Sequence, residues 1–215
     1  RPYFKDGLHQ LIRETSRNGN AETKQPTALA AELINAILKG EYRFESGIEK
    51  IYYAPECAVQ LNYASSGQQE AIWILLLLFK YMLDETNVFV VFEEPEAHLY
   101  PEAQKSMVEL MALLANTAKN QVVVTTHSPY ILSAFNNLLY AHQLGTKSPE
   151  IAQKAAHIVD SHYWIASERA AAYFMNGHND ESIIEPELRL IQAEKIDSAS
   201  ELINNVFNAL FDLDE

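Results

Sequence analysis

Residues 87–101 read NVFVVFEEPEAHLYP, and this stretch decides the fold class. Its first six residues form an almost continuous apolar run, which is typical of a strand buried on both faces of a parallel sheet. Glu93 and Glu94 follow the run, and Pro101 favours the first turn of a helix. Residues 121–126, QVVVTT, predict a second strand of the same kind. Because short connections join strand, helix and strand, we expect an α/β fold built on a parallel sheet flanked by helices.

The sequence upstream of this stretch predicts an arm of one helix and two strands. Residues 15–26 are polar, contain glycine and proline, and read as a loop. Apolar residues recur at helical spacing over 29–38, and Gly40 ends this predicted helix. Residues 48–53 and 58–63 read as short strands.

The sequence downstream predicts another helix and a smaller addition. Ser128 and Pro129 suit the N-cap and the first turn of a helix. The remainder predicts a small mixed α/β extension that ends in an acidic amphipathic helix, with Ser198 and Glu201 as its capping box. We therefore divide the chain into three regions, 1–57, 58–145 and 146–215.

Polar side chains follow both predicted strands. In parallel α/β sheets, ligands bind at the carboxyl ends of the strands, where Glu93, Glu94 and His127 are expected. One carboxylate there can hold Mg²⁺, and a second can orient or deprotonate an attacking water. A histidine can donate a hydrogen bond to a phosphate oxygen. Each feature alone also has a plain structural reading, a solvated strand end for the glutamates and a loop residue for the histidine.

A small turn, residues 64–70 (ASSGQQE), precedes a helix that is expected to start near Gly67. Free backbone N–H groups and the positive end of the helix dipole suit phosphate at such a turn. The plain reading is an ordinary helix start, because Ser66 and Gln69 satisfy the capping-box pattern. The order of the features along the chain decides between these readings.

Taken in order, the turn, the apolar helix, the strand with two glutamates, the next helix and the strand before His127 resemble the second half of an ATP-binding cassette. The resemblance covers about residues 58–135. Residues 92–101, FEEPEAHLYP, look like the Walker B motif and D-loop of SMC-like P-loop ATPases. The likeness is greatest to the branch that contains the OLD-family proteins and many bacterial ATPases. It implies that the region 58–145 is an ABC-type ATPase core.

The resemblance also implies roles for the turn and for the D-loop. Ser65, Gly67 and Gln68 would form the signature loop, which contacts the γ-phosphate of ATP held by the opposite protomer. Glu96 and His98 would lie in the D-loop at the dimer interface. The implied partner is therefore a second copy of the chain, which joins the first on ATP binding.

The strand ends receive their roles by the same resemblance. Glu93 would serve Mg²⁺, Glu94 would be the general base, and His127 would be the switch histidine that senses the γ-phosphate. The implied cofactors are ATP and Mg²⁺. The family usually has aspartate as the metal carboxylate, and Glu93 is one methylene longer.

One motif of a complete ATPase is missing. A phosphate-binding loop, G-x-x-x-x-G-K-[ST], needs a Gly-Lys pair, and none of the seven glycines is followed by lysine. We expect an N-terminal lobe with this loop upstream or in another chain. Without that lobe, residues 121–126 would form an apolar sheet edge, so we predict that another segment, another copy or another chain covers it.

Composition limits the partners and the compartment. The net charge is −13, and residues 179–215 hold ten acidic and two basic side chains. Acidic surfaces repel phosphate backbones, so this segment favours a protein effector, and any nucleic acid would bind elsewhere. The longest apolar run, 71–79, falls short of the roughly 20 residues that span a bilayer. A single cysteine, Cys57, fits a reducing cytosol, and we expect a cytoplasmic protein with no membrane contact.

These features predict an ATPase in the complete protein, which powers or gates an assembly of the DNA-repair or phage-defence type. An alternative is an ATP-gated binding module with little or no turnover that acts on a protein partner. A transporter subunit is disfavoured, because the helix over 71–79 is apolar almost all round where transporter cassettes carry arginines. A nuclease is disfavoured, because the first Asp-x-Asp pair, 212–214, lies at the extreme end of the chain.

Overall fold

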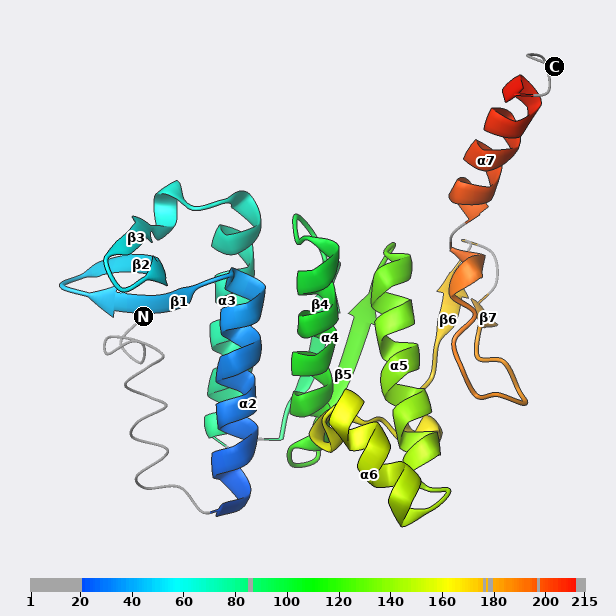
Figure 1. Ribbon diagram of the computed structural model, residues 1–215, viewed down its shortest axis with the longest axis horizontal. Helices are drawn as coiled ribbons and strands as arrows, with labels where there is room; N and C mark the ends of the chain where they lie inside the picture. Colours follow the sequence, from blue (N-terminus) through cyan, green and yellow to red (C-terminus); the bar gives the residue numbers. More distant parts are fainter. Residues whose placement is uncertain (1–20, 85–86, 176, 178–179, 197, 212–215) are drawn as a thin grey trace. The chain divides into compact units, whose positions relative to one another are not determined.

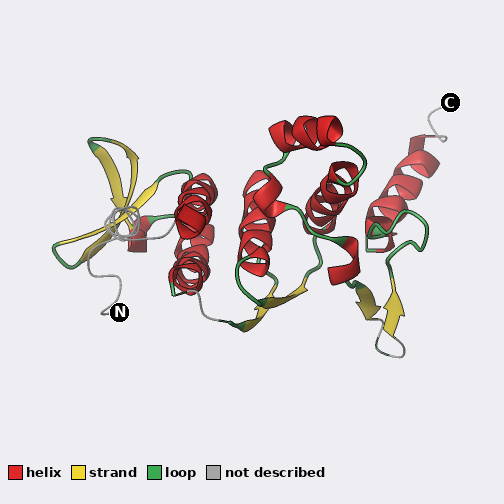
Figure 2. Ribbon diagram, turned by 90° about the horizontal axis from the view of Figure 1, so that it is seen from below, coloured by secondary structure: helices red, strands yellow, loops and turns green. Residues whose placement is uncertain are grey.

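The computed structural model describes the chain except residues 1–20, 85–86, 176, 178–179, 197 and 212–215. Short strands alternate with helices in the described chain, which is α/β with three small sheets (Figures 1 and 2). Two compact units make up this chain, and Thr126 and His127 mark the change from the first to the second. Asp160–Tyr163 belongs to the first unit. The division falls inside the region 58–145 that the sequence predicts as one core.

The first helix, α2, spans Ala21–Leu38 and includes Pro26. The prediction of a loop over 15–26 is therefore wrong for residues 21–26, and residues 15–20 lie outside the described part. Pro26 removes only one hydrogen bond here, the one to the carbonyl of Glu22, so the helix continues through it. The predicted apolar side is confirmed, since Leu33, Ile34, Ile37 and Leu38 are all buried.

The end of α2 differs in detail from the prediction. Lys39, with φ 51°, takes the left-handed conformation that the sequence assigns to glycine. Gly40 is needed for a different reason, because a Cβ there would lie 2.8 Å from both Ile51 Cγ2 and the Tyr52 carbonyl. Gly40 therefore allows the chain to pass close to the following sheet.

The first sheet is antiparallel, in the order β1-β2-β3, with β1 at Glu41–Glu45, β2 at Ile48–Ala54 and β3 at Cys57–Gln60. Ser46 and Gly47 form the hairpin turn with φ 52° and 83°, as a tight two-residue hairpin requires. The two predicted strands are confirmed in outline. The strand β1 was not predicted, and Leu61–Tyr63, predicted as strand, is the short 3₁₀ helix η2.

The apolar helix α3 spans Ser66–Leu83 and packs on α2. Ile72, Leu75 and Phe79 are among its fully buried side chains, which confirms the expectation of a buried helix on that face. The opposite side is partly open, since Trp73 is 50% and Leu77 41% exposed.

The second sheet holds the two strands that decided the fold class. β4, Phe89–Glu93, and β5, Gln121–Thr125, pair in parallel, in a register that places Phe92 opposite Val124 and Glu93 opposite Thr125. Between them α4 spans Pro101–Asn116. The strand–helix–strand prediction is confirmed.

Helix α4 carries much of the core of the first unit. It packs against both α2 and α3. Met107, Leu110 and Leu114 of this helix are fully buried, and Ala118, two residues beyond its end, has φ 55°. The side chain of Asn120 ties this helix to β4, since its oxygen accepts from Val88 N at 2.8 Å and its amide donates to the Leu114 carbonyl at 2.9 Å.

The β4–β5 sheet is covered on one face only, so the prediction of strands buried on both faces is wrong for the described chain. Phe92 is 6% exposed, whereas Phe89 and Val91 on the opposite face are 66% and 50% exposed, and Val123 of β5 is 42% exposed. Among the described strands, β5 pairs only with β4. No described segment therefore covers this face or the outer edge of β5, and the predicted covering segment stays a prediction.

The second unit is built on α5, Pro129–Gly145, against which α6, Pro149–Ile158, packs. Ser128 is the N-cap of α5, as predicted. Ile131, Leu132, Leu138 and Leu139 form its buried face, whereas Tyr130 is 57% exposed.

The remainder of the second unit is small and irregular. It comprises the short helices η4 (Ser167–Arg169) and η5 (Ala193–Lys195), the hairpin of β6 (Tyr173–Met175) and β7 (Asp180–Ser182), and helix α7 (Ser198–Phe211). Val206, Phe207, Leu210 and Phe211 of α7 are each more than half exposed. The side chains of the predicted capping box, Ser198 and Glu201, lie outside the described residues. No helix in the described chain is long and apolar enough to cross a membrane.

Candidate functional site

Two exposed glutamates end strand β4. Glu93 is its last residue, and Glu94 follows in the left-handed conformation, with φ 44°. The backbone N–H of Glu94 donates to the Thr125 carbonyl at 2.9 Å, so both glutamates are fixed to the end of the parallel ladder. A non-glycine residue at positive φ is strained, and such strain concentrates at functional sites.

A tight turn follows the glutamates and continues to α4. Ala97 N donates to the Glu94 carbonyl and Leu99 N to the Glu96 carbonyl, each at 2.9 Å. The Thr126 hydroxyl donates to Glu96 Oε1 at 2.5 Å, which ties the turn to the end of β5. The predicted D-loop is thus held by both parallel strands. The role of Thr126 was missed from the sequence, although its place directly after β5 was a usable signal.

The turn before α3 is a capping box, but one residue earlier than predicted. Ser65 is the N-cap, and its hydroxyl accepts from Gln68 N at 3.3 Å, while Gln68 Oε1 accepts from Ser65 N at 3.1 Å. The amide nitrogen of Gln68 donates to the Leu38 carbonyl at 2.6 Å, and Tyr53 Oη donates to Gln68 Oε1 at 3.3 Å. The Gln68 side chain is therefore engaged within the protein, and its predicted contact with nucleotide stays a prediction.

Gly67 brings this turn against the D-loop. Gly67 is buried, and a Cβ there would lie 3.1 Å from the carbonyl carbon of His98 and closer still to its oxygen. Beside this contact, His98 Nε2 lies 3.7 Å from Glu70 Oε2. His98 itself is left-handed, with φ 59°. The turn over 64–70, the predicted D-loop and the carboxylates of β4 are therefore held together within the first unit.

His127 belongs to the second unit and is exposed. It follows β5 by two residues and precedes the N-cap of α5, Ser128. Its position in the chain agrees with the predicted switch histidine, and its role stays a prediction.

The residues present fit a magnesium ion bound together with a nucleotide. Mg²⁺ is usually held by one or two carboxylates plus phosphate oxygens and water, and Glu93 and Glu94 supply two exposed carboxylates at one strand end. In the described part of the chain, no group of three or more His, Cys, Asp or Glu side chains could hold a metal unaided.

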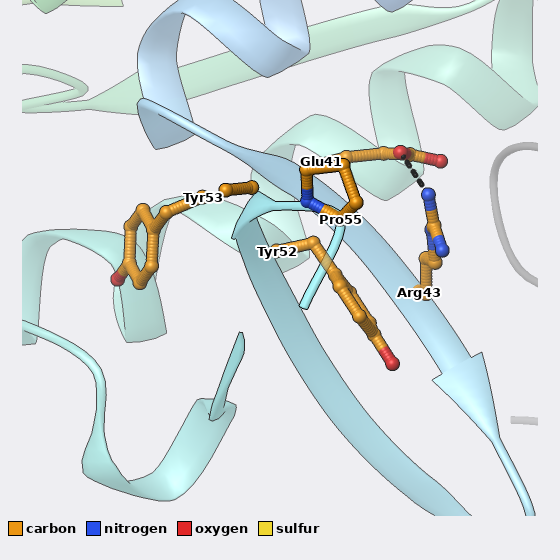
Figure 3. Close-up of a pocket in the computed structure, with 6 residues that line it drawn as sticks. Glu41, Arg43, Tyr52, Tyr53 and Pro55 are labelled. Atoms are coloured by element: carbon orange, nitrogen blue, oxygen red, sulfur yellow. Dashed lines mark hydrogen bonds and ion pairs between the residues drawn. The ribbon is translucent and has the colours of Figure 1, made fainter. Parts of the chain in front are cut away.

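A hollow of about 310 Å³ lies on the first sheet, away from these residues in sequence (Figure 3). Arg43 in its wall donates to Glu41 at 2.6 Å and lies over the ring of Tyr52, 4.4 Å from the ring centre. The hydrogen bond to Glu41 raises the pKa of the Arg43 guanidinium. Arg43, the one positively charged side chain that lines the hollow, is thus already paired with Glu41. None of the predicted site residues lines the hollow.

A comparison with protein families agrees with the geometry. The model of the AAA ATPase domain family AAA_15 matches residues 5–132, more than half of the chain. The chain belongs to the AAA ATPase domain family. Membership implies ATP binding and suggests ATPase activity. The match to this AAA ATPase domain contains residues 64–70, both strand-end glutamates and the turn that follows them.

Two solved structures resemble this AAA ATPase domain. One, described as "Structural biochemistry of ATP-driven dimerization and DNA stimulated activation of SMC ATPases", has 12% identity and a TM-score of 0.47, and the match covers 85% of this chain and 93% of that one. The SMC head domain from Thermotoga maritima has 18% identity and a TM-score of 0.38, with 59% and 44% covered. These values mark a loose likeness in fold, so family membership rests on the sequence match alone. The comparison with curated proteins gave no match.

Proposed function

We propose that this chain is the C-terminal lobe of an SMC-like ABC ATPase, in which two protomers enclose ATP between them. The observation that carries the proposal is the contact of Gly67 with His98, which joins the signature turn to the D-loop and to the glutamates of β4. One protomer could then meet the partner's nucleotide with its turn while its own carboxylates act on another nucleotide.

Each proposed role uses an exposed group of the turn, of the end of β4 or of the residue that follows β5. Ser65 and the first turn of α3 would bind the γ-phosphate of ATP held by the partner, at the positive end of the helix dipole. Glu93 would hold Mg²⁺, which neutralises charge on the phosphates when it is bound. Glu94 would accept a proton from the attacking water, and His127 would donate a hydrogen bond to the γ-phosphate.

The phosphate-binding loop would come from an N-terminal lobe, because no Gly-Lys pair occurs in the sequence. The exposed face of the β4–β5 sheet supports this proposal. Parallel sheets are normally covered on both faces, and Phe89 and Val91 leave one face of this sheet apolar and open. The process served by the complete ATPase would be of the DNA-repair or phage-defence type.

Glu94→Gln in the complete protein tests the proposal. The substitution keeps the size of the side chain and removes the base, so we expect ATP turnover to fall by about 10²-fold or more and an ATP-bound dimer to accumulate. Turnover is measured by phosphate release, and dimer formation by sedimentation velocity with and without Mg·ATP. Glu102→Gln is the matched control, since Glu102 is an exposed carboxylate on α4 that forms an ion pair with Lys39 Nζ at 2.8 Å. Unchanged turnover in Glu94→Gln would remove Glu94 from the role of base.

A second candidate is an ATP-gated binding module with little or no turnover. The exposed apolar row on α7, which includes Phe207 and Leu210, favours a binding role for the second unit. Single-turnover hydrolysis by the unmodified complete protein discriminates the two candidates. A rate indistinguishable from that of ATP without the protein would favour the binding module.

A further inference from the structure

Two tyrosines flank the region formed by the proposed signature turn, residues 64–70, and the proposed D-loop after Glu94. Tyr63 lies two residues before the N-cap Ser65, and Tyr100 lies two residues after His98. Each is 77% exposed, more than any other aromatic side chain in the described part of the chain. Because Gly67 packs on the His98 backbone, the segments that carry the two tyrosines are in contact with each other.

The backbone beside each tyrosine is held by a glutamine. Gln69 Nε2 donates to the Ala64 carbonyl at 2.8 Å, and Gln104 Nε2 donates to the Leu99 carbonyl at 3.1 Å. Tyr63 also follows Leu61, which is buried, and so sits at the end of an anchored 3₁₀ turn.

Tyr100 is fixed further as the N-cap of α4. Its carbonyl accepts from Gln104 N at 3.1 Å, and Pro101 follows as the first helical residue. Both rings are therefore exposed on ordered backbone, so little backbone entropy remains to be lost when they are covered.

We propose that Tyr63 and Tyr100 are the aromatic anchors that the signature turn and the D-loop insert into a second copy of this protein in the ATP-closed dimer. The inference rests on the proposed function, since the signature turn must meet the partner's nucleotide. Tyrosines on rigid backbone are frequent binding hot spots, because the ring buries a large area while the hydroxyl stays compatible with water.

The charges around the tyrosines disfavour a nucleic acid as the partner. Glu70, Glu93 and Glu94 are exposed nearby and would repel a phosphate backbone, whereas the phosphates of ATP would reach Glu93 together with Mg²⁺. The chain as a whole carries −13, so uncharged side chains at a contact between two copies avoid adding to the repulsion between like charges. Neutral aromatic side chains supply such contacts.

The test uses the complete protein carrying Glu94→Gln, so that hydrolysis does not reopen the dimer. Tyr63→Ala and Tyr100→Ala are compared with Tyr63→Phe and Tyr100→Phe, which keep the rings. Tyr173→Ala is the matched control, because Tyr173 is 63% exposed but lies on β6 of the second unit. Sedimentation velocity with Mg·ATP gives the dimer dissociation constant, and titration with a fluorescent ATP analogue gives nucleotide affinity.

We expect each alanine variant to weaken the dimer by roughly 30-fold or more, as for binding hot spots, and each phenylalanine variant and the control to change it by less than about 5-fold. Equal dimer affinity in the alanine variants and in Tyr173→Ala overturns the inference and leaves the proposed function standing. Absence of an ATP-dependent dimer in the Glu94→Gln parent overturns both. The tyrosines are exposed, so circular dichroism should give the same spectrum for all variants.

Discussion

Gly67→Ala is the substitution that tests the site most directly. An alanine Cβ at this position would lie 3.1 Å from the carbonyl carbon of His98 and within 3.0 Å of its oxygen, a separation that real Cβ atoms essentially never show. The neighbour is backbone, which cannot swing aside as a side chain would. The D-loop or the first turn of α3 must therefore move by several tenths of an ångström.

The expected magnitude combines two opposing terms. Replacing glycine by alanine in a helix stabilises the folded state by about 0.5–1 kcal/mol. Overpacking of a tight contact costs about 1–3 kcal/mol. We expect the cost to win, with a net loss of about 1–2 kcal/mol in the free energy of unfolding. Because a misplacement of about 1 Å can cost about 10²-fold in rate, turnover of the complete protein should fall by about 10-fold or more.

Urea unfolding of the 215-residue chain measures the first effect, and phosphate release by the complete protein measures the second. Ser66→Ala is the stability control, since Ser66 is exposed, is the neighbouring residue in the same helical turn and is not the N-cap. A Gly67→Ala chain as stable as Ser66→Ala or more stable, with unchanged turnover, would refute the role of the Gly67–His98 contact.

Two further predictions concern the frame around the site. Asn120→Ala removes three hydrogen bonds, to Val88 N and to the carbonyls of Leu114 and Thr117, and should lower the free energy of unfolding by about 3 kcal/mol, measured by urea unfolding. Burial, and next the hydrogen bond to Glu49, raises the pKa of Tyr42 above its usual value. The Tyr42 hydroxyl loses its proton at about pH 10 in the unfolded chain and only at higher pH in the folded protein. Its contribution to the free energy of unfolding is therefore complete below about pH 10 and is lost as the pH rises from there through the pKa of the folded state. Tyr42→Phe should flatten the loss of stability above pH 10 in alkaline unfolding curves.

The strands and helices of the parallel unit could be predicted because their signals are local. An apolar run gives β4, a second run gives β5, and Pro101 fixes the start of α4. The strand β1 gives no such signal. Its sequence, EYRFE, carries three charges, and Tyr42 is its only buried side chain.

The start of α3 illustrates why a local pattern can fail by one residue. Ser65 with Gln68 and Ser66 with Gln69 both satisfy the capping-box pattern, so the sequence allows two registers. A tertiary contact separates them, because Gln68 Nε2 reaches the Leu38 carbonyl at 2.6 Å, 30 residues away. The Gly67–His98 contact also joins residues far apart in sequence, and no spacing rule could reveal it.

The candidate site, like the start of α3, could be predicted from the sequence only in part. The strand-end position of Glu93 and Glu94 follows from the sequence, because a buried run must end where charges begin. The left-handed backbone of Glu94 does not follow, since it depends on the hydrogen bond to the Thr125 carbonyl. The roles of Ser65, Gln68 and His127 in binding nucleotide remain predictions.

The proposed N-terminal lobe would explain both the exposed face of the β4–β5 sheet and the missing Gly-Lys pair. Phe89, Val91 and Val123 would cost stability in water unless another surface covers them, and burial of such side chains contributes about 1.5–3 kcal/mol each. A lobe that brought the phosphate-binding loop to the ends of β4 and β5 would also place a strand and a helix beside β5. The covering surface and the phosphate-binding loop are therefore best sought in the same segment, and a partner that covers the apolar face without supplying the loop would leave Glu93 and Glu94 with no triphosphate of their own to act on.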